Sequence, residues 1–222
     1  MHLFDVIGPI MIGPSSSHTA GAAQIGYITR QLLGENPIKV DIGLYGSFAK
    51  TYRGHGTDKA LVGGLLGMAV DDERLRNSLS LADDEGFQYN FHPIVLRGAH
   101  PNTVVLSVEG VNGRHITVQA ASLGGGEIRV EKIDGMEVRF SGKSNTIIIS
   151  YHDVPGMIAQ ISRLFAKSII NIGAMRVIRD TVGGTAVVVL EIDNDADSAL
   201  LKNLADIQDV YHVTYLSARK EA

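Results

Sequence analysis

The sequence predicts an α+β fold, and three observations support this prediction. Residues 15–33 carry apolar side chains at the spacing of one helix face. Residues 38–45 alternate apolar and polar side chains, as a half-buried strand does. Further along, Asn112-Gly113 and Asp134-Gly135 separate short strand-like runs and are typical of hairpin turns. The chain is therefore expected to combine helices with hairpin-connected strands.

The first 143 residues are expected to form one domain of mixed elements. The predicted helices cover residues 15–33, 59–68 and 71–84, and the predicted strands cover residues 38–45, 87–92, 104–108, 115–122, 128–133 and 136–140. Residues 47–53 are expected to begin a loop. The three glycines at 124–126 open no helix, so they predict a hinge or bulge between strands and not a dinucleotide-binding loop.

A short polar linker, residues 141–144, marks the predicted boundary to a second domain of residues 144–222. The elements expected there are a strand at 145–150, a helix at 157–165, strands at 172–179 and 185–192, a helix at 197–204 and a strand at 210–215. The order βαββαβ is that of ferredoxin-like domains.

Composition excludes several classes of function. The chain is 45% hydrophobic and 20% charged with a net charge of −4, and the absence of a Lys/Arg-rich run argues against nucleic acid or an anionic membrane as partner. No apolar stretch approaches the roughly 20 residues of a membrane span, and the N-terminus lacks the pattern of a signal peptide, so a cytoplasmic protein is expected. The chain contains no cysteine, which excludes disulfides and cysteine ligands for zinc or an iron–sulfur cluster.

The first stretch that can carry chemistry is Gly13–Thr19, with the sequence GPSSSHT. A Gly-Pro turn precedes four hydroxyls and one imidazole, and a helix follows. The first N–H groups of a helix have no intrahelical partner and the helix dipole favours negative charge there, so this stretch predicts an anion site. The alternative is a simple helix cap with additional serines.

The second such stretch is Gly54–Ala60, with the sequence GHGTDKA. His55 lies between two glycines that let the backbone approach a ligand. Thr57 or Asp58 can cap the helix that follows. The alternative is a surface turn with an exposed histidine.

Residues 145–222 resemble an ACT domain. The resemblance rests on the order βαββαβ, on Asp153–Gly156 (DVPG) after the first strand, and on Ile170–Ile172 (INI). ACT domains usually pair and bind amino acids near the Pro-Gly turn, which implies a candidate effector site at Asp153, Gly156 and Asn171. Asn171 matches the serine-binding members, whereas Tyr151 and Asp153 replace their usual polar ligands, so a purely dimerising role is at least equally expected.

The first domain resembles the β portion of the iron–sulfur-dependent L-serine dehydratases. The motifs are Gly13–Thr19, Leu44–Ser47 (LYGS), Gly54–Ala60 and Pro101–Thr103 (PNT), in that order along the chain. Together with the ACT-like part, the resemblance covers essentially the whole chain. It implies that the first domain adopts the allosteric-substrate-binding fold also found in some phosphoglycerate dehydrogenases.

The resemblance implies a reaction and a partner. Members of this family use a four-iron four-sulfur cluster to dehydrate L-serine, giving pyruvate and ammonia. Because this chain has no cysteine, the cluster is expected on a separate α subunit that bears cysteines, with the present chain as the β subunit. The β subunit is expected to be inactive without that partner.

Site roles follow from the resemblance together with the chemistry of the side chains. The substrate carboxylate is assigned to the hydroxyls at the helix start, which are Ser15, Ser16, Ser17 and Thr19. His55 is the preferred base for the Cα proton and His18 the second candidate, because imidazole titrates near neutral pH. Asp58 would orient an imidazole or simply serve the following helix, and Asn102 would contact substrate. A zinc site made of His18, His55 and Asp58 agrees in ligand type but matches no metal motif in spacing.

A second function is kept open beside the dehydratase subunit. A non-catalytic amino-acid sensor, in which both domains bind serine, would also explain the serine cluster and the ACT-like part. L-threonine is retained as a second substrate, because one methyl group in a pocket discriminates by only about 1–3 kcal/mol.

Overall fold

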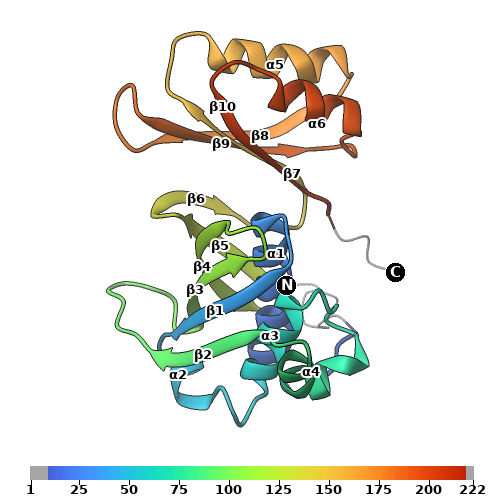
Figure 1. Ribbon diagram of the computed structural model, residues 1–222, viewed down its shortest axis with the longest axis vertical. Helices are drawn as coiled ribbons and strands as arrows, with labels where there is room; N and C mark the ends of the chain where they lie inside the picture. Colours follow the sequence, from blue (N-terminus) through green and yellow to red (C-terminus); the bar gives the residue numbers. More distant parts are fainter. Residues whose placement is uncertain (1–9, 219–222) are drawn as a thin grey trace, which may run out of the picture. The chain divides into compact units, whose positions relative to one another are not determined.

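The computed structural model describes residues 10–218 and divides into two compact units, one ending at Gly135 and the other beginning at Met136 (Figure 1). This division falls shortly before the linker 141–144 that the sequence suggests as a boundary. Each unit combines a sheet with helices, which confirms the α+β class.

The first sheet has six strands in the order β2-β1-β3-β4-β5-β6. Their bounds are β1 (Pro37–Leu44), β2 (Gln88–Pro93), β3 (Thr103–Gly110), β4 (His115–Gly124), β5 (Glu127–Ile133) and β6 (Met136–Phe140). β1 pairs with β2 in parallel and with β3 in antiparallel, and β3–β4 and β4–β5 are antiparallel hairpins. The Asn-Gly and Asp-Gly signals both lie at turns, and the glycines at 124–126 lie where β4 turns into β5.

The helices of the first unit are α1 (Gly21–Leu33), α2 (Ser47–Thr51), α3 (Thr57–Leu65) and α4 (Ser78–Asp84). A π-helical turn, η2 (Ser16–Ala20), leads into α1, and a 3₁₀ helix, η3 (Glu73–Asn77), precedes α4. The predicted helix at 71–84 is therefore two short helices. The predicted loop at 47–53 was wrong in part, because its first five residues form α2.

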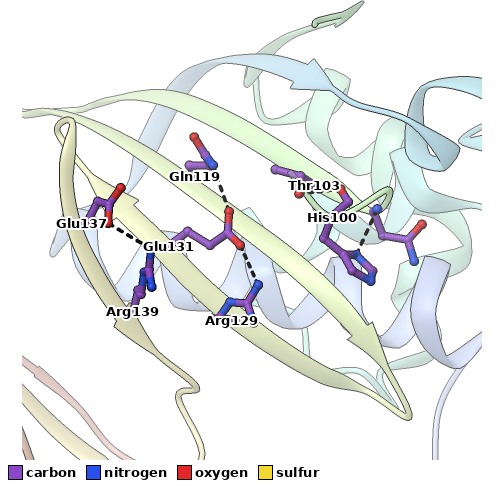
Figure 2. Close-up of polar contacts among 8 residues, drawn as sticks. His100, Thr103, Gln119, Arg129, Glu131, Glu137 and Arg139 are labelled. Carbon is purple, nitrogen blue, oxygen red and sulfur yellow. Dashed lines mark hydrogen bonds and ion pairs between the residues drawn. The ribbon is translucent and has the colours of Figure 1, made fainter. Parts of the chain in front are cut away.

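The sheet presents an apolar face to the helices and a polar face away from them. Val40, Leu106 and Val118 are fully buried on the helix side. On the other side, the Glu131 carboxylate accepts hydrogen bonds from Gln119 Nε2 and Arg129 Nη2, each at 2.9 Å (Figure 2). This alternation is the expected result of side chains pointing to opposite faces of a strand.

α1 and α3 cross at two glycines. A Cβ atom added to Gly64 would lie 2.1 Å from the Ala23 carbonyl oxygen, and one added to Gly26 would lie 2.3 Å from that of Leu61. The backbones can approach this closely only because neither position has a side chain. Since α3 begins two residues after His55 and α1 continues η2, the crossing fixes the two candidate site segments relative to each other.

The second unit contains β7 (Asn145–His152), α5 (Met157–Lys167), β8 (Ile172–Arg179), β9 (Thr185–Ile192), α6 (Ser198–Ala205) and β10 (Val210–Leu216). Four antiparallel strands form a sheet in the order β10-β7-β9-β8. α5 and α6 lie over one face of it (Figure 1), and its core includes Ile149, Ile161 and Val188. The βαββαβ prediction is confirmed.

Within residues 10–218, no helix is both long and apolar enough to cross a membrane.

Candidate active site

The serine-rich segment forms the start of a helix. Ser15 has an extended backbone and caps the turn, because its Oγ accepts a hydrogen bond from the His18 N–H at 3.1 Å. The Ser15 carbonyl accepts from the N–H groups of Thr19 and Ala20, at 2.8 and 3.3 Å. The N–H groups of Ser16 and Ser17 have no partner among the described residues. They are therefore the donors that a ligand at the helix start can use.

His18 is bonded at both ring nitrogens. Its Nδ1 lies 3.0 Å from Ser17 Oγ, and its Nε2 lies 3.1 Å from Ser47 Oγ. Ser17 Oγ in turn lies 3.3 Å from Ser15 Oγ. The His18 ring is packed edge-on against the buried Phe48, with ring centroids 5.3 Å apart. The imidazole is therefore held on its two nitrogens and on one face.

α2 is positioned by the turn that precedes it. Gly46 has φ 61° and ψ −120°, and a Cβ atom there would lie 2.5 Å from the Pro101 carbonyl oxygen. That conformation and that space are available only to glycine. The Ser47 N–H then donates to the Pro101 carbonyl at 2.7 Å. The end of β1 is thus tied to the Pro101–Thr103 turn.

His55 follows α2 and stands beside His18. The two ring centroids are 4.9 Å apart. The Thr51 carbonyl, at the end of α2, accepts a hydrogen bond from the His55 N–H at 3.1 Å and lies 3.4 Å from His55 Nδ1. The His55 carbonyl accepts from Thr19 Oγ1 at 3.0 Å. Nε2 of His55 has no hydrogen-bond partner in the described part of the chain.

The surroundings of His18 disfavour its charged form. Burial lowers the pKa of His18 below its ordinary value, and the neighbouring His55 lowers it further, because two adjacent imidazolium ions repel each other. His18 is therefore neutral at neutral pH, with one ring nitrogen as donor and the other as acceptor.

Asp58 lies in the first turn of α3 and not at its cap, which is Gly56. Its Oδ1 accepts a hydrogen bond from the Lys59 N–H at 2.8 Å, and no bond joins Asp58 to an imidazole within residues 10–218. Burial raises the pKa of the Asp58 carboxyl above its ordinary value. The preceding residue, Thr57, is fully buried, and its hydroxyl has no partner in the part of the chain that the structure describes.

Asn102 lies in a turn organised by His100. The Asn102 N–H donates to His100 Nδ1 at 3.2 Å, and the Thr103 hydroxyl donates to the His100 carbonyl at 2.7 Å (Figure 2). The Asn102 Oδ1 atom is buried and has no partner among the described residues, and the same holds for the hydroxyl of Ser122, whose N–H donates to the Asn102 carbonyl at 3.0 Å. A Cβ atom on Gly21 would lie 2.0 Å from Ser122 Oγ, so this hydroxyl points at the first residue of α1.

The candidate effector residues of the second unit already have partners within it. Asp153 Oδ2 accepts from Arg179 Nη1 at 3.2 Å and from the Gly183 N–H at 3.3 Å. Asn171 Nδ2 donates to Asp193 Oδ2 at 2.7 Å. Gly156 caps α5 with φ 92°. No bond joins Asp153 to Asn171.

The structure therefore brings together most, but not all, of the residues selected from the sequence. Those joined by contacts are Ser15, Ser17, His18, Thr19 and His55. Ser16 shares the turn, whereas Asp58 and Asn102 have other partners. Sequence reasoning gave no role to Ser47, although it belongs to the Leu44–Ser47 motif, and none to Ser122. Ser47 could have been noticed as a hydroxyl directly after a strand-ending glycine, whereas Ser122 lies inside a plain strand pattern with no local signal.

Comparison of the sequence with known proteins identifies the family of this chain. The family model described as "Serine dehydratase beta chain" matches residues 2–86, and the ACT domain model matches residues 145–209. The chain is 39% identical over 215 residues to the "Probable L-serine dehydratase, beta chain" of Bacillus subtilis, covering 97% of each protein. It is 37% identical over 206 residues to the "L-serine dehydratase, beta chain" of Peptoniphilus asaccharolyticus, covering 92% of this chain and 93% of that one.

A third relative is longer. The "L-serine dehydratase" of Mycobacterium tuberculosis is 30% identical over 158 residues, which are 60% of this chain but only 34% of that protein.

Fold and matches thus define a serine dehydratase β-type unit followed by an ACT domain. The chain belongs to the L-serine dehydratase beta-chain family, as its resemblance in motifs implies.

Proposed function

We propose that this chain is the β subunit of an L-serine ammonia-lyase that converts L-serine to pyruvate and ammonia. Family membership gives the coarse assignment, a serine dehydratase subunit. The chemistry of the residues in this chain supports the more specific assignment, the conversion of L-serine to pyruvate and ammonia. The observation that carries the proposal is an imidazole with a free Nε2, placed beside a hydroxyl-rich helix start.

His55 is proposed as the base that removes the Cα proton of serine. A carbonyl oxygen only accepts hydrogen bonds, so the 3.4 Å contact to Thr51 favours the proton on Nδ1. The lone pair then lies on Nε2, the nitrogen without a partner among residues 10–218. Both nitrogens of His18 are engaged by hydroxyls, so His18 is less suited to take a proton from substrate.

The helix start is proposed to bind the substrate carboxylate. Its donors are the N–H groups of Ser16 and Ser17 and the hydroxyls of this turn, which donate without adding a titrating charge. Thr19 contributes indirectly, because its hydroxyl holds the His55 carbonyl. This places the carboxylate site and the base on segments that the structure joins directly. Asn102 stays a candidate for a further substrate contact.

The residues of this chain do not fit an iron–sulfur cluster. Such clusters are held mainly by cysteine thiolates, and the chain has none. Among residues 10–218, no group of three or more His, Asp or Glu side chains is placed to hold a metal ion either. We therefore propose that a four-iron four-sulfur cluster is carried by a separate α subunit.

The length of the M. tuberculosis relative supports such a partner. About two thirds of that protein has no counterpart in this chain, since the match covers only 34% of it. We propose that the unmatched portion corresponds to an α subunit that this chain must bind. The ACT domain is proposed to mediate self-association, with serine binding at Asp153, Gly156 and Asn171 as a further possibility for regulation.

Anaerobic co-purification tests the proposal. The full chain is co-expressed with a cysteine-bearing α subunit from the same genome, purified without oxygen, and assayed for pyruvate formation from L-serine. A brown complex that forms pyruvate is the expected result. The non-catalytic sensor is favoured instead if no complex forms and the isolated chain binds serine.

A further inference from the structure

Four side chains form a continuous hydrogen-bond chain beside the proposed base. Ser47 Oγ contacts His18 Nε2 at 3.1 Å, and His18 Nδ1 contacts Ser17 Oγ at 3.0 Å. Ser17 Oγ contacts Ser15 Oγ at 3.3 Å. Ser15 lies at the helix start, whereas Ser47 lies at the first residue of α2, 29 positions after His18. These hydrogen bonds thus connect the proposed carboxylate site to α2.

Each of these four side chains can donate or accept a hydrogen bond, so the hydrogen bonds can all run in one direction or all in the opposite direction. In one direction, the Ser47 hydroxyl donates to His18 Nε2, His18 Nδ1–H donates to Ser17, and the Ser17 hydroxyl donates to Ser15. In the other direction each bond is reversed and His18 carries its proton on Nε2. The neutral imidazole decides between them, because only one of its nitrogens carries hydrogen.

The first direction suits an anion at the helix start. Ser15 Oγ already accepts the His18 N–H at 3.1 Å, and in this direction it also accepts from Ser17. Both lone pairs of Ser15 Oγ are then used, so the hydrogen of the Ser15 hydroxyl must go to an acceptor that is not one of these four side chains. In the reverse direction the Ser15 hydroxyl donates to Ser17, so its hydrogen is not available to a ligand.

We propose that Ser47 is a positioning residue that sets the direction of this chain, so that a substrate carboxylate receives the Ser15 hydroxyl hydrogen while His18 holds its proton on Nδ1. Carboxylate binding and the His18 tautomer are then coupled, and the coupling acts in both directions. The inference rests on the proposed function for the identity of the ligand.

The neutral state of His18 agrees with this role. Its burial, and the His55 ring 4.9 Å away, both disfavour a charged imidazolium. A charged ring would donate from both nitrogens, so the Ser47 hydroxyl would have to accept from Nε2 and could no longer decide which nitrogen carries the proton. The contact with Phe48 on a third side keeps the ring oriented toward Ser47.

The test compares Ser47→Ala with Ser47→Thr, which keeps the hydroxyl. In the complex with the α subunit, Ser47→Ala is expected to raise KM for L-serine about five- to tenfold with kcat changed less than about threefold, because one hydrogen bond supporting binding is lost. Ser47→Thr is expected to restore KM. Ser162→Ala, on the exposed side of α5, is the matched control and should leave both constants unchanged.

A second measurement reads the tautomer directly. Nitrogen-15 NMR of the histidine rings in the full isolated chain, with L-serine added, should show His18 protonated on Nδ1, and Ser47→Ala should lose this preference. The inference is overturned if His18 is protonated on Nε2 or does not respond to serine, or if Ser47→Ala leaves KM unchanged. Failure of the wild-type complex to form pyruvate would instead overturn the proposed function.

Discussion

The two histidines of the candidate site differ in what their ring nitrogens contact. His18 has a hydroxyl on each nitrogen, whereas His55 has a carbonyl on one side and no described partner on the other. Identical side chains thus have different hydrogen-bond partners. From the sequence both were candidates for the base, because the glycines around His55 indicate access but say nothing about hydrogen-bond partners.

Replacing His55 with alanine is expected to abolish turnover. A positioned base contributes roughly 10²–10⁴-fold to a proton-transfer step, so His55→Ala should lower kcat by at least about a hundredfold. Co-purification with the α subunit should be retained, because the backbone of His55, and not its ring, accepts the Thr19 bond. Pyruvate formation measures the effect, and near-normal activity would place the base elsewhere.

His18 is expected to make stability depend on pH. Its pKa is lowered in the folded state from the ordinary histidine value of 6.5, so the unfolded chain binds more protons below that pH. The contribution of His18 to stability is therefore present above pH 6.5 and is lost as the pH falls toward its lowered pKa.

Urea unfolding of wild type and His18→Gln at several pH values measures this contribution. The stability difference between the two proteins should shrink in that acidic window. A difference between wild type and His18→Gln that stays constant with pH would contradict the prediction.

Buried hydroxyls with and without partners should respond differently to removal. Ser122 and Ser78 are both fully buried, but Ser78 Oγ donates to the Lys59 carbonyl at 2.6 Å whereas Ser122 Oγ has no partner among residues 10–218. Ser78→Ala is expected to cost about 1–2 kcal/mol of unfolding free energy, and Ser122→Ala is expected to cost nothing or to stabilise by up to about 1 kcal/mol. Denaturant unfolding measures both; an equal loss in the two variants would mean that Ser122 is bonded in solution.

At the scale of elements, α2 shows where sequence reasoning reached its limit. Its five residues are too few to show a helical period, and the glycines on both sides indicate a loop. The helix exists because Gly46 turns the chain and Phe48 is buried beneath His18. Its importance comes from tertiary contacts at its two ends, since Ser47 holds one imidazole and Thr51 the other. Long periodic elements such as α1 and β1 were predictable, whereas this short connector was not.

The crossing of α1 and α3 is expected to be intolerant of added volume. Gly64→Ala places a methyl group 2.1 Å from the Ala23 carbonyl, which forces the helices apart and should cost about 1–3 kcal/mol of unfolding free energy. Gly54→Ala is the control, because its methyl group would lie 3.7 Å from the Thr51 carbonyl oxygen, an ordinary van der Waals distance. Thermal or denaturant unfolding measures the difference. A tolerated Gly64→Ala would show that the crossing has room to adjust.

At the scale of the whole molecule, one chain forms two compact units. The order of elements in the second unit was readable from the sequence because each strand and helix is bounded by clear turn residues. The strand order of the first sheet was not, since it places β1 between β2 and β3, and pairings between distant segments leave no local pattern. Residue types indicated what chemistry was available, but only the fold could show which side chains meet.

Self-association is expected to involve the edge strand β8. Met175 and Val177 are 39% and 48% exposed at the edge of the second sheet, opposite buried residues of β9. An exposed apolar edge strand is a template for pairing with a second copy. Val177→Glu should therefore reduce the apparent mass of the full chain in sedimentation experiments.

Val182→Glu provides the matched control. Val182 is 83% exposed but lies in the turn between β8 and β9, where it is not part of the edge. This substitution should leave the mass unchanged. Loss of association with Val182→Glu alone would place the contact outside the strand.

The π-helical turn before α1 has a consequence for how the serine cluster can vary. Its bonds from Gly21 N–H to Ser16 O and from Ala20 N–H to Ser15 O span five residues, one more than in an α-helix. Each residue of an α-helix advances the direction of its side chain by about 100°. The extra residue therefore sets the angular phase between the serines and the apolar side of α1. Because residues 15–17 are all serine, deleting any one of them gives the same sequence: two serines still precede His18, and Pro14 takes the place of Ser15. The turn would then lose the hydroxyl that accepts the His18 N–H, even though its composition would hardly change.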